Sequence, residues 1–174
     1  MSDTKILTER LIIRLFADGD LDDLTALIRD KMASQYAPYD FQWPTDDASM
    51  KGILSYYMSE EPWSWCAVEL NATKHVIGFV CAGGDTTRGF GYTIRSDYQN
   101  KGYASEAGDA LLNYCIDNLG TTCFKSGTAD CNIPSVKLLL KLGFSKIRSF
   151  EGSFAKDATG NSITFAAGEY ERIV

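Results

Sequence analysis

The sequence predicts an α+β fold with a mixed, mostly antiparallel central sheet flanked by about four helices. Three strand-like runs follow one another through short turns in the middle of the chain, which is typical of an antiparallel meander. The complete order of elements is β-α-α-β-β-β-α-β-α-β-β, whereas a doubly wound parallel sheet would alternate strands and helices throughout. The length of 174 residues, with 45% apolar and 23% charged residues, fits one globular domain spanning residues 1–174.

In the first half, we expect a strand over residues 8–15 and helices over 18–32 and 45–58. Leu21, Leu24, Leu27 and Ile28 recur at helical spacing in the first helix, and Asp18 or Asp20 could cap it. An aromatic loop, residues 36–44, joins the two helices. The meander then takes residues 63–70, 74–82 and 89–95, with turns at 71–73 and 83–85.

In the second half, an amphipathic helix is predicted over residues 102–119, ended by Gly120. A strand over 122–129 precedes a short helix over 133–142, for which Asn132 is the predicted N-cap. Strands over 144–150 and 163–173 close the chain around a polar hairpin, residues 151–162.

Composition excludes several functional classes. The net charge is −6 and no run of Lys and Arg occurs, which argues against nucleic-acid binding. No apolar stretch approaches the ~18 residues of a membrane span, and the first five residues do not read as a signal peptide, so we expect a cytoplasmic protein without membrane contact. Five cysteines without a C-x-x-C pair, and a single histidine, predict neither a disulfide framework nor a metal site. The acidic surface suits a cationic partner such as an amine, although acidity also serves solubility.

Residues 99–104 lie between a predicted strand and the strongest predicted helix. A strand that turns into a helix through Gly102 leaves free N–H groups at the helix start, which attract an anion. Lys101 adds a positive charge, and Ala104 keeps the first turn uncrowded. Taken alone, the pattern is more typical of an ordinary helix start with a glycine turn, because such patterns are common.

Three spaced motifs give the segment a more specific meaning. Residues 91–107 resemble the acetyl-coenzyme A motif of the GNAT superfamily of N-acetyltransferases, Gln/Arg-x-x-Gly-x-Gly/Ala after a strand. Asn132, Ser135, Leu138 and the run 141–144 resemble its second signature, Asn-x-x-Ser-x-x-Leu-x-x-Lys-Leu-Gly-Phe. Residues 8–14 are similar to the start of the RimJ/RimL-type branch.

The resemblance implies acetyl-CoA as co-substrate, with no metal, and assigns roles to individual residues. Ser135 would be the general acid for the leaving thiolate, and backbone N–H groups from Tyr92 to Ile94 would stabilise the oxyanion. The cofactor contacts would come from Thr93, Ile94 and Arg95 for the pantetheine arm, from Gln99, Asn100, Lys101, Gly102, Tyr103, Ala104 and Ser105 for the pyrophosphate, and from Asn132 and Lys141. Asn132 could instead be only a helix cap, Ser135 a first-turn residue and Lys141 a solvated charge.

The general base is not assigned. Many members of the branch carry Glu where this chain has Gly89, and the Tyr that serves some relatives as acid corresponds to Leu139. Asp85, Glu69 and Glu151 are the remaining candidates for the base. A lysine side chain is about 0.04% neutral at pH 7 and an α-amine roughly 10%, so an α-amine tolerates a missing base better.

We therefore expect direct transfer of an acetyl group in a ternary complex to a primary amine, either a protein N-terminal α-amine or a small molecule. The aromatic loop and the polar hairpin would wall the acceptor site, or the loop would form a separate apolar cluster. The alternative is a non-catalytic acyl-CoA-binding or sensing protein, which Gly89 favours. The protein would be a monomer or a homodimer.

Overall fold

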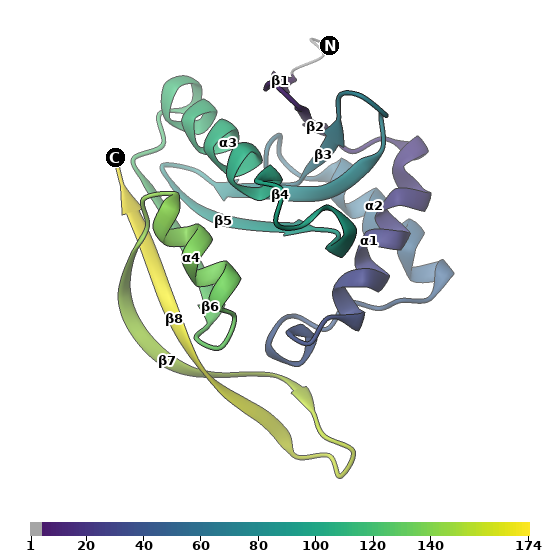
Figure 1. The fold of residues 1–174 in the computed structure, drawn as a ribbon, viewed down its shortest axis with the longest axis vertical. Helices are drawn as coiled ribbons and strands as arrows, with labels where there is room; N and C mark the ends of the chain where they lie inside the picture. Colours follow the sequence, from purple (N-terminus) through teal and green to yellow (C-terminus); the bar gives the residue numbers. More distant parts are fainter. Residues whose placement is uncertain (1–4) are drawn as a thin grey trace.

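The computed structural model describes residues 5–174 and contains one mixed sheet, with strand order β1-β2-β3-β4-β5-β6-β8-β7 (Figure 1). The strands are β1 (Ile6–Leu7), β2 (Leu11–Leu15), β3 (Cys66–Leu70), β4 (Val76–Gly84), β5 (Thr87–Ile94), β6 (Cys123–Ala129), β7 (Ser145–Lys156) and β8 (Ser162–Ile173). The pair β5 and β6 is parallel, and the other pairs are antiparallel. This arrangement confirms the predicted α+β class.

Four α-helices flank the sheet, as predicted. They are α1 (Leu21–Ala33), α2 (Asp47–Ser59), α3 (Tyr103–Leu119) and α4 (Ile133–Lys141). Short 3₁₀ helices precede three of them: η1 (Asp18–Asp20) before α1, η2 (Ala37–Tyr39) before α2 and η3 (Ser96–Tyr98) before α3. Between residues 5 and 174, no helix is long and apolar enough to cross a membrane. The expectation about a signal peptide rests mainly on residues 1–4, which lie outside the described part.

The helices cover opposite faces of the sheet, because alternate strand residues point to opposite sides. One face packs with α3 and α4 in a core that includes Val68, Val80, Phe90, Leu111 and Leu139. The other face packs with α1 and α2 in a second core that includes Leu24, Leu54, Ala67 and Phe79. Figure 1 shows α3 and α4 side by side, apart from α1 and α2.

The ends of the helices follow from local sequence signals. Asp46 caps α2 by accepting a hydrogen bond from the Ser49 backbone N–H, and Asn132 caps α4 in the same way for Ser135. Gly120 ends α3 in the left-handed region, at φ 66°. The predicted caps at Asn132 and Gly120 are thus confirmed.

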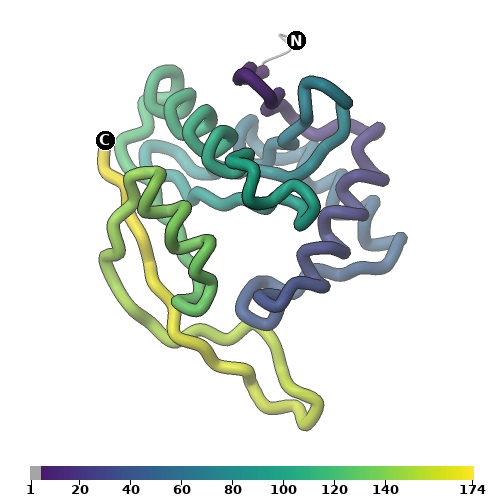
Figure 2. Tube along the Cα trace, viewed as in Figure 1, coloured from purple at the N-terminus to yellow at the C-terminus, as the bar shows by residue number. Residues whose placement is uncertain are grey.

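The predicted polar hairpin differs from the structure. Strand β7 continues to Lys156 and β8 begins at Ser162, so residues 157–161 alone form the connection. Backbone pairing such as Gly152 with Phe165 extends the ladder through the polar segment, because polarity on both faces does not prevent two strands from pairing. Figure 2 shows this hairpin, in yellow and yellow-green, extending beyond the rest of the chain.

Two strand boundaries near the start of the meander also differ. The strand predicted over 63–70 begins at Cys66, because Trp63 has a φ of 75°, which extended backbone does not allow. The strand predicted over 8–15 begins at Leu11, as β2, and the short strand β1 precedes it at Ile6–Leu7. The observed order therefore has one strand more at its start than predicted, and the order from β2 onward is as predicted.

Candidate active site

Strand β5 loses one of its two neighbours halfway along its length. It pairs with β4 from Arg88 to Ile94, but its parallel pairing with β6 covers residues 87–89 alone. The backbone N–H of Arg95 donates to Ile77 O on the β4 side, so by the alternation of the ladder the N–H and C=O groups of Tyr92 and Ile94 face the open side. We call this diverging pair of strands the fork. Its exposed backbone can accept an extended ligand as another strand would.

The N-terminus of α3 lies a short loop beyond the fork. Gly102, at φ 83°, precedes the helix without any side-chain cap, and Asn100 is also left-handed, at φ 59°. The first turn's hydrogen bond runs from Glu106 N to Gly102 O, so the N–H groups of residues 103–105 have no partner within the helix. These groups and the positive end of the helix dipole are the donors on which the predicted anion site depends.

A brace that the sequence analysis did not identify holds this loop in place. Arg10 donates to Lys101 O at 2.9 Å, pairs with Glu106 at 2.7 Å, and lies over the Tyr103 ring at 4.4 Å. Thr8 donates its hydroxyl hydrogen to the same carboxylate. Burial raises the pKa of Glu106, but hydrogen bonds from Thr8 and Arg10 outweigh that effect and leave it below its ordinary value. No local sequence signal links residues so far apart in the chain.

Three further predicted cofactor residues gather on the same loop. Gln99 donates its side-chain N–H to Ile94 O at 2.8 Å, which ties the loop to the end of β5. Arg95 and Lys101 lie over the Tyr98 ring, and each also bonds to Asp97. The charged groups of Arg95 and Lys101 therefore lie beside the predicted anion site, but each already bonds to Asp97.

On the other side of the fork, α4 brings Asn132 and Ser135 to β5. The Tyr92 hydroxyl donates to Ser135 Oγ at 2.9 Å, and Asn132 Oδ1 accepts from Ser135 N at 3.3 Å. Burial raises the pKa of Tyr92 to about 12, although the hydrogen bond with Ser135 opposes this. Lys141 is exposed in the last turn of α4, at the opposite end from Ser135.

Two hollows lie near the fork. One, of about 400 Å³, is lined by residues of β5 to β8, including Phe90, Ser126 and Arg148. The other is a groove of about 620 Å³, and its lining residues include Gly83, Asp85 and Gly89 of the β4–β5 hairpin together with Tyr56, Glu60, Glu61 and Trp65. Both hollows include residues next to the point where β5 and β6 separate.

The candidate bases have different surroundings. Glu69 is 8% exposed and pairs with Arg14 at 2.6 Å, which also binds Asp20, so this carboxylate is part of a buried ion cluster. Glu151 is exposed on β7. Asp85 lines the groove that contains Gly89.

The same groove contains two acids that the sequence analysis missed, Glu60 and Glu61. They directly follow α2, and only their position after a predicted helix could have drawn attention to them. Throughout residues 5–174, no three His, Cys, Asp or Glu side chains gather as ligands for a metal ion.

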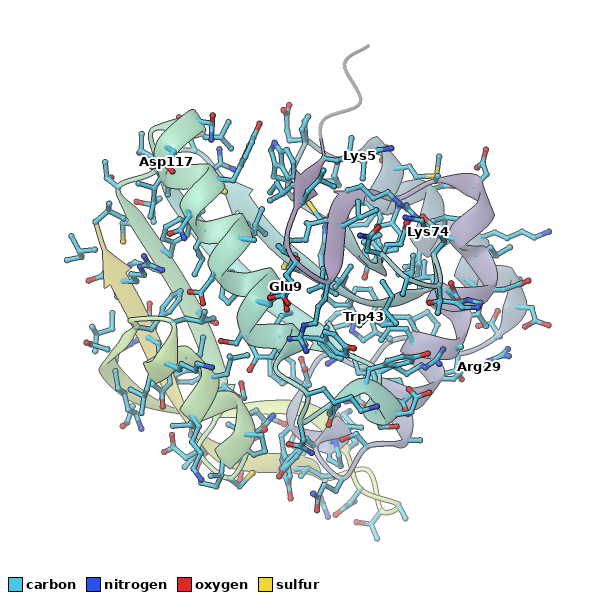
Figure 3. The ribbon with its side chains drawn as sticks, turned by 45° about the horizontal axis from the view of Figure 1, so that its top comes forward. Lys5, Glu9, Arg29, Trp43, Lys74 and Asp117 are labelled. Carbon is cyan, nitrogen blue, oxygen red and sulfur yellow. The ribbon has the colours of Figure 1, made fainter. Side chains whose placement is uncertain are left out.

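The aromatic loop has two separate roles. Trp43, labelled in Figure 3, packs edge-on against Tyr57 and Trp65 within the second core. Tyr39 contacts Phe165 of β8 with a ring separation of 5.5 Å. Part of the loop is thus an apolar cluster, and part of it meets the β7–β8 hairpin.

Comparison with known proteins gives a consistent result. Residues 10–145 match the family described as acetyltransferase (GNAT) domain. An uncharacterized N-acetyltransferase of Bacillus subtilis, YnaD, is 28% identical over 154 residues, which cover 87% of this chain and 86% of that protein. A crystal structure of a GNAT-family acetyltransferase from Bacillus anthracis matches with a TM-score of 0.82 at 21% identity, over 98% of both chains.

The fold is also shared by a structure of RimL, a ribosomal L7/L12 alpha-N-protein acetyltransferase in complex with coenzyme A, with a TM-score of 0.78 at 15% identity over 98% of both chains. The fork, the uncapped start of α3 and the start of α4 all lie within the matched family region. The chain therefore belongs to the GNAT family of acetyl-CoA-dependent N-acetyltransferases.

Proposed function

We propose that this enzyme transfers the acetyl group of acetyl-CoA directly to a primary amine in a ternary complex, without a covalent enzyme intermediate. The observation that carries the proposal is the fork, because β5 offers unpaired backbone groups between the anion site of α3 and the hydroxyl of Ser135. The amine nitrogen attacks the thioester carbon and the C–S electron pair leaves on sulfur. The N–H groups of Tyr92 and Ile94 on the open side of β5 support the oxyanion.

The cofactor residues follow the course of the chain through this site. Thr93, Ile94 and Arg95 hold the pantetheine arm, residues 99–105 hold the pyrophosphate, and Asn132 and Lys141 contribute from α4. The free N–H groups at the start of α3 support the pyrophosphate assignment. The support for Lys141 is weaker in geometric terms, since it lies at the far end of α4 from Ser135.

We propose a protein N-terminal α-amine or a small-molecule amine as acceptor. An α-amine is about 250 times more often neutral at pH 7 than a lysine side chain, which offsets much of the loss of a general base. The shared fold with an enzyme named for α-N-acetylation of a ribosomal protein supports the first choice. Asp85, Glu60 or Glu61 in the groove could accept the amine proton through water.

The alternative function is binding or sensing of acyl-CoA without turnover. Gly89 favours it, because a glycine cannot titrate where the resemblance expects a carboxylate. A transferase cleaves the thioester of acetyl-CoA when an amine is present, whereas a binding protein leaves the thioester intact.

The test is thiol release from acetyl-CoA in the presence of α-amine peptides, lysine derivatives, polyamines and aminoglycosides. Acceptor-dependent release, with the acetylated product identified by mass spectrometry, supports the transferase. Tight acetyl-CoA binding by calorimetry with no release for any acceptor supports the binding protein instead.

A further inference from the structure

The hydroxyl groups of Tyr92 and Ser135 meet across the fork, one from strand β5 and one from helix α4. Tyr92 lies on the part of β5 that pairs with β4 but not with β6, and Ser135 lies in the first turn of α4. Their oxygen atoms are 2.9 Å apart, with the phenol as donor. The contact is the point where α4 reaches the open edge of β5.

The 2.9 Å contact fixes the position of the Ser135 oxygen against the Tyr92 phenol. With the phenol as donor, Ser135 Oγ accepts one hydrogen bond and keeps its own hydrogen for another partner. The Ser135 backbone is fixed as well, since its N–H donates to Asn132 Oδ1. On the strand, the Tyr92 ring packs at 5.9 Å from Phe90, which stacks on Phe144.

The acidity of the two hydroxyls limits their chemistry. A free thiol has a pKa of about 8.5, well below that of the Tyr92 phenol, which burial raises to about 12. Transfer of the phenol proton to a coenzyme A thiolate is therefore uphill, and the unassisted hydroxyl of a serine is a weaker acid than a phenol. A hydrogen bond from Ser135 to the sulfur requires no such transfer.

We infer that Tyr92 is a positioning residue that orients the Ser135 hydroxyl so that it donates a hydrogen bond to the thioester sulfur as the C–S bond breaks. The inference rests on the proposed function. The C–S electron pair stays on sulfur, the thiolate later takes a proton from water, and the amine proton goes to water or to a groove carboxylate. Ser135 thus stabilises the leaving group without losing its own proton.

The first experiment needs no turnover. Calorimetry measures the affinity of the protein for coenzyme A from pH 6 to pH 9, with desulfo-coenzyme A as the probe that lacks the sulfur. If Ser135 donates to the sulfur, the bound thiol ionises below its ordinary pKa of about 8.5, and coenzyme A gains affinity over the desulfo probe as the pH rises. Tyr92→Phe should remove at least half of this gain and leave desulfo-coenzyme A binding unchanged.

The outcomes separate the inference from the proposed function. If wild-type protein binds neither coenzyme A nor acetyl-CoA, the proposed function fails. A second outcome is that coenzyme A binds and Ser135→Ala removes the pH-dependent gain in affinity, but Tyr92→Phe keeps it. If a melting curve shows that the Tyr92→Phe protein is folded, this outcome overturns the positioning role of Tyr92. Absence of any gain in wild type also overturns it while leaving the transferase intact.

A kinetic double-mutant cycle gives a second readout. We expect Tyr92→Phe and Ser135→Ala each to lower kcat about tenfold, and the double variant to lose little more than Ser135→Ala, because both act on one hydrogen bond to the sulfur. Tyr114→Phe, a change to a tyrosine on α3 that packs on Trp63, is the matched control and should keep kcat. Independent, multiplying losses in the double variant would contradict the shared role.

Discussion

The residue at position 89 decides whether the site has a carboxylate there to deprotonate the acceptor amine. A Cβ added at Gly89 would meet a single neighbour, Gly83 O at 3.9 Å, and the backbone there is not left-handed. Space and conformation therefore permit a larger residue. The neighbouring strand places Lys125 opposite Gly89, and its ammonium group lies 3.9 Å from both Glu169 and Glu171. The glycine thus leaves a site for a carboxylate beside an existing cation.

The substitution Gly89→Glu should raise kcat/KM at pH 7 several-fold for a lysine-type acceptor and less for an α-amine. The new carboxylate can accept the proton of the attacking amine, and lysine depends more on that help. Lys125 lowers the pKa of a carboxylate beside it, so the gain should increase in Gly89→Glu/Lys125→Met, where the base is stronger.

The control for this prediction is Thr87→Glu, which adds a carboxylate to the same face of β5 one alternation further from the fork. Steady-state rates with both acceptors provide the measurement. An equal gain in Thr87→Glu would mean that added negative charge, rather than a placed base, is responsible.

At the scale of elements, the two ends of α3 allow the binding role of its start to be separated from backbone strain. Gly102 and Gly120 flank the helix and both are left-handed, at φ 83° and 66°. A Cβ at Gly120 would meet nothing within 4 Å, whereas one at Gly102 would lie 3.3 Å from the Arg10 guanidinium. The same substitution therefore has the same conformational cost at each end but disturbs the anion site only at the start.

We expect Gly102→Ala and Gly120→Ala each to lower the free energy of unfolding by about 1–2 kcal/mol, from the left-handed backbone alone. Gly102→Ala should also weaken coenzyme A binding about tenfold, a difference of about 1.4 kcal/mol, while Gly120→Ala should not. Denaturant unfolding and calorimetry measure the two quantities. Equal affinity in the two variants would place the pyrophosphate elsewhere.

The brace between the N-terminal segment and α3 should be visible in the pH dependence of stability. The folded-state pKa of Glu106 is lowered, so its stabilisation is fully present above the unfolded value near 4.5 and is lost as the pH falls through the folded value. The difference in melting temperature between wild type and Glu106→Gln should therefore be largest at neutral pH and shrink below about pH 4.

A melting-temperature difference for Glu106→Gln that stays constant from pH 7 to pH 3 would show that the carboxylate charge does not stabilise the brace.

At the scale of the whole molecule, the sequence predicts what local patterns determine. Periodicity and caps located α3 and α4 and the meander, because those signals lie within each element. The contacts that complete the site are distant in the chain. Tyr92 and Ser135 are 43 residues apart, and Arg10 and Glu106 are 96 apart, so no spacing rule pairs them. The sequence also did not predict that β7 and β8 extend through the polar segment, because backbone pairing rather than hydrophobic alternation forms that part of the ladder.

The last prediction concerns how the assembled site handles the amine proton. If no carboxylate acts as base, the acceptor must lose its proton in solution, so kcat/KM should rise with pH up to the pKa of the acceptor itself. The value of kcat/KM would then level off near pH 8 for an α-amine and above pH 10 for a lysine-type amine.

The acids of the groove offer the competing route. A base among Asp85, Glu60 and Glu61 would give an inflection in the pH profile that is the same for both acceptors. We expect the inflection to follow the acceptor, and rate profiles with two amines of different pKa measure it. An inflection that does not move, and that disappears in Asp85→Asn, Glu60→Gln or Glu61→Gln, would contradict deprotonation in solution and identify the base.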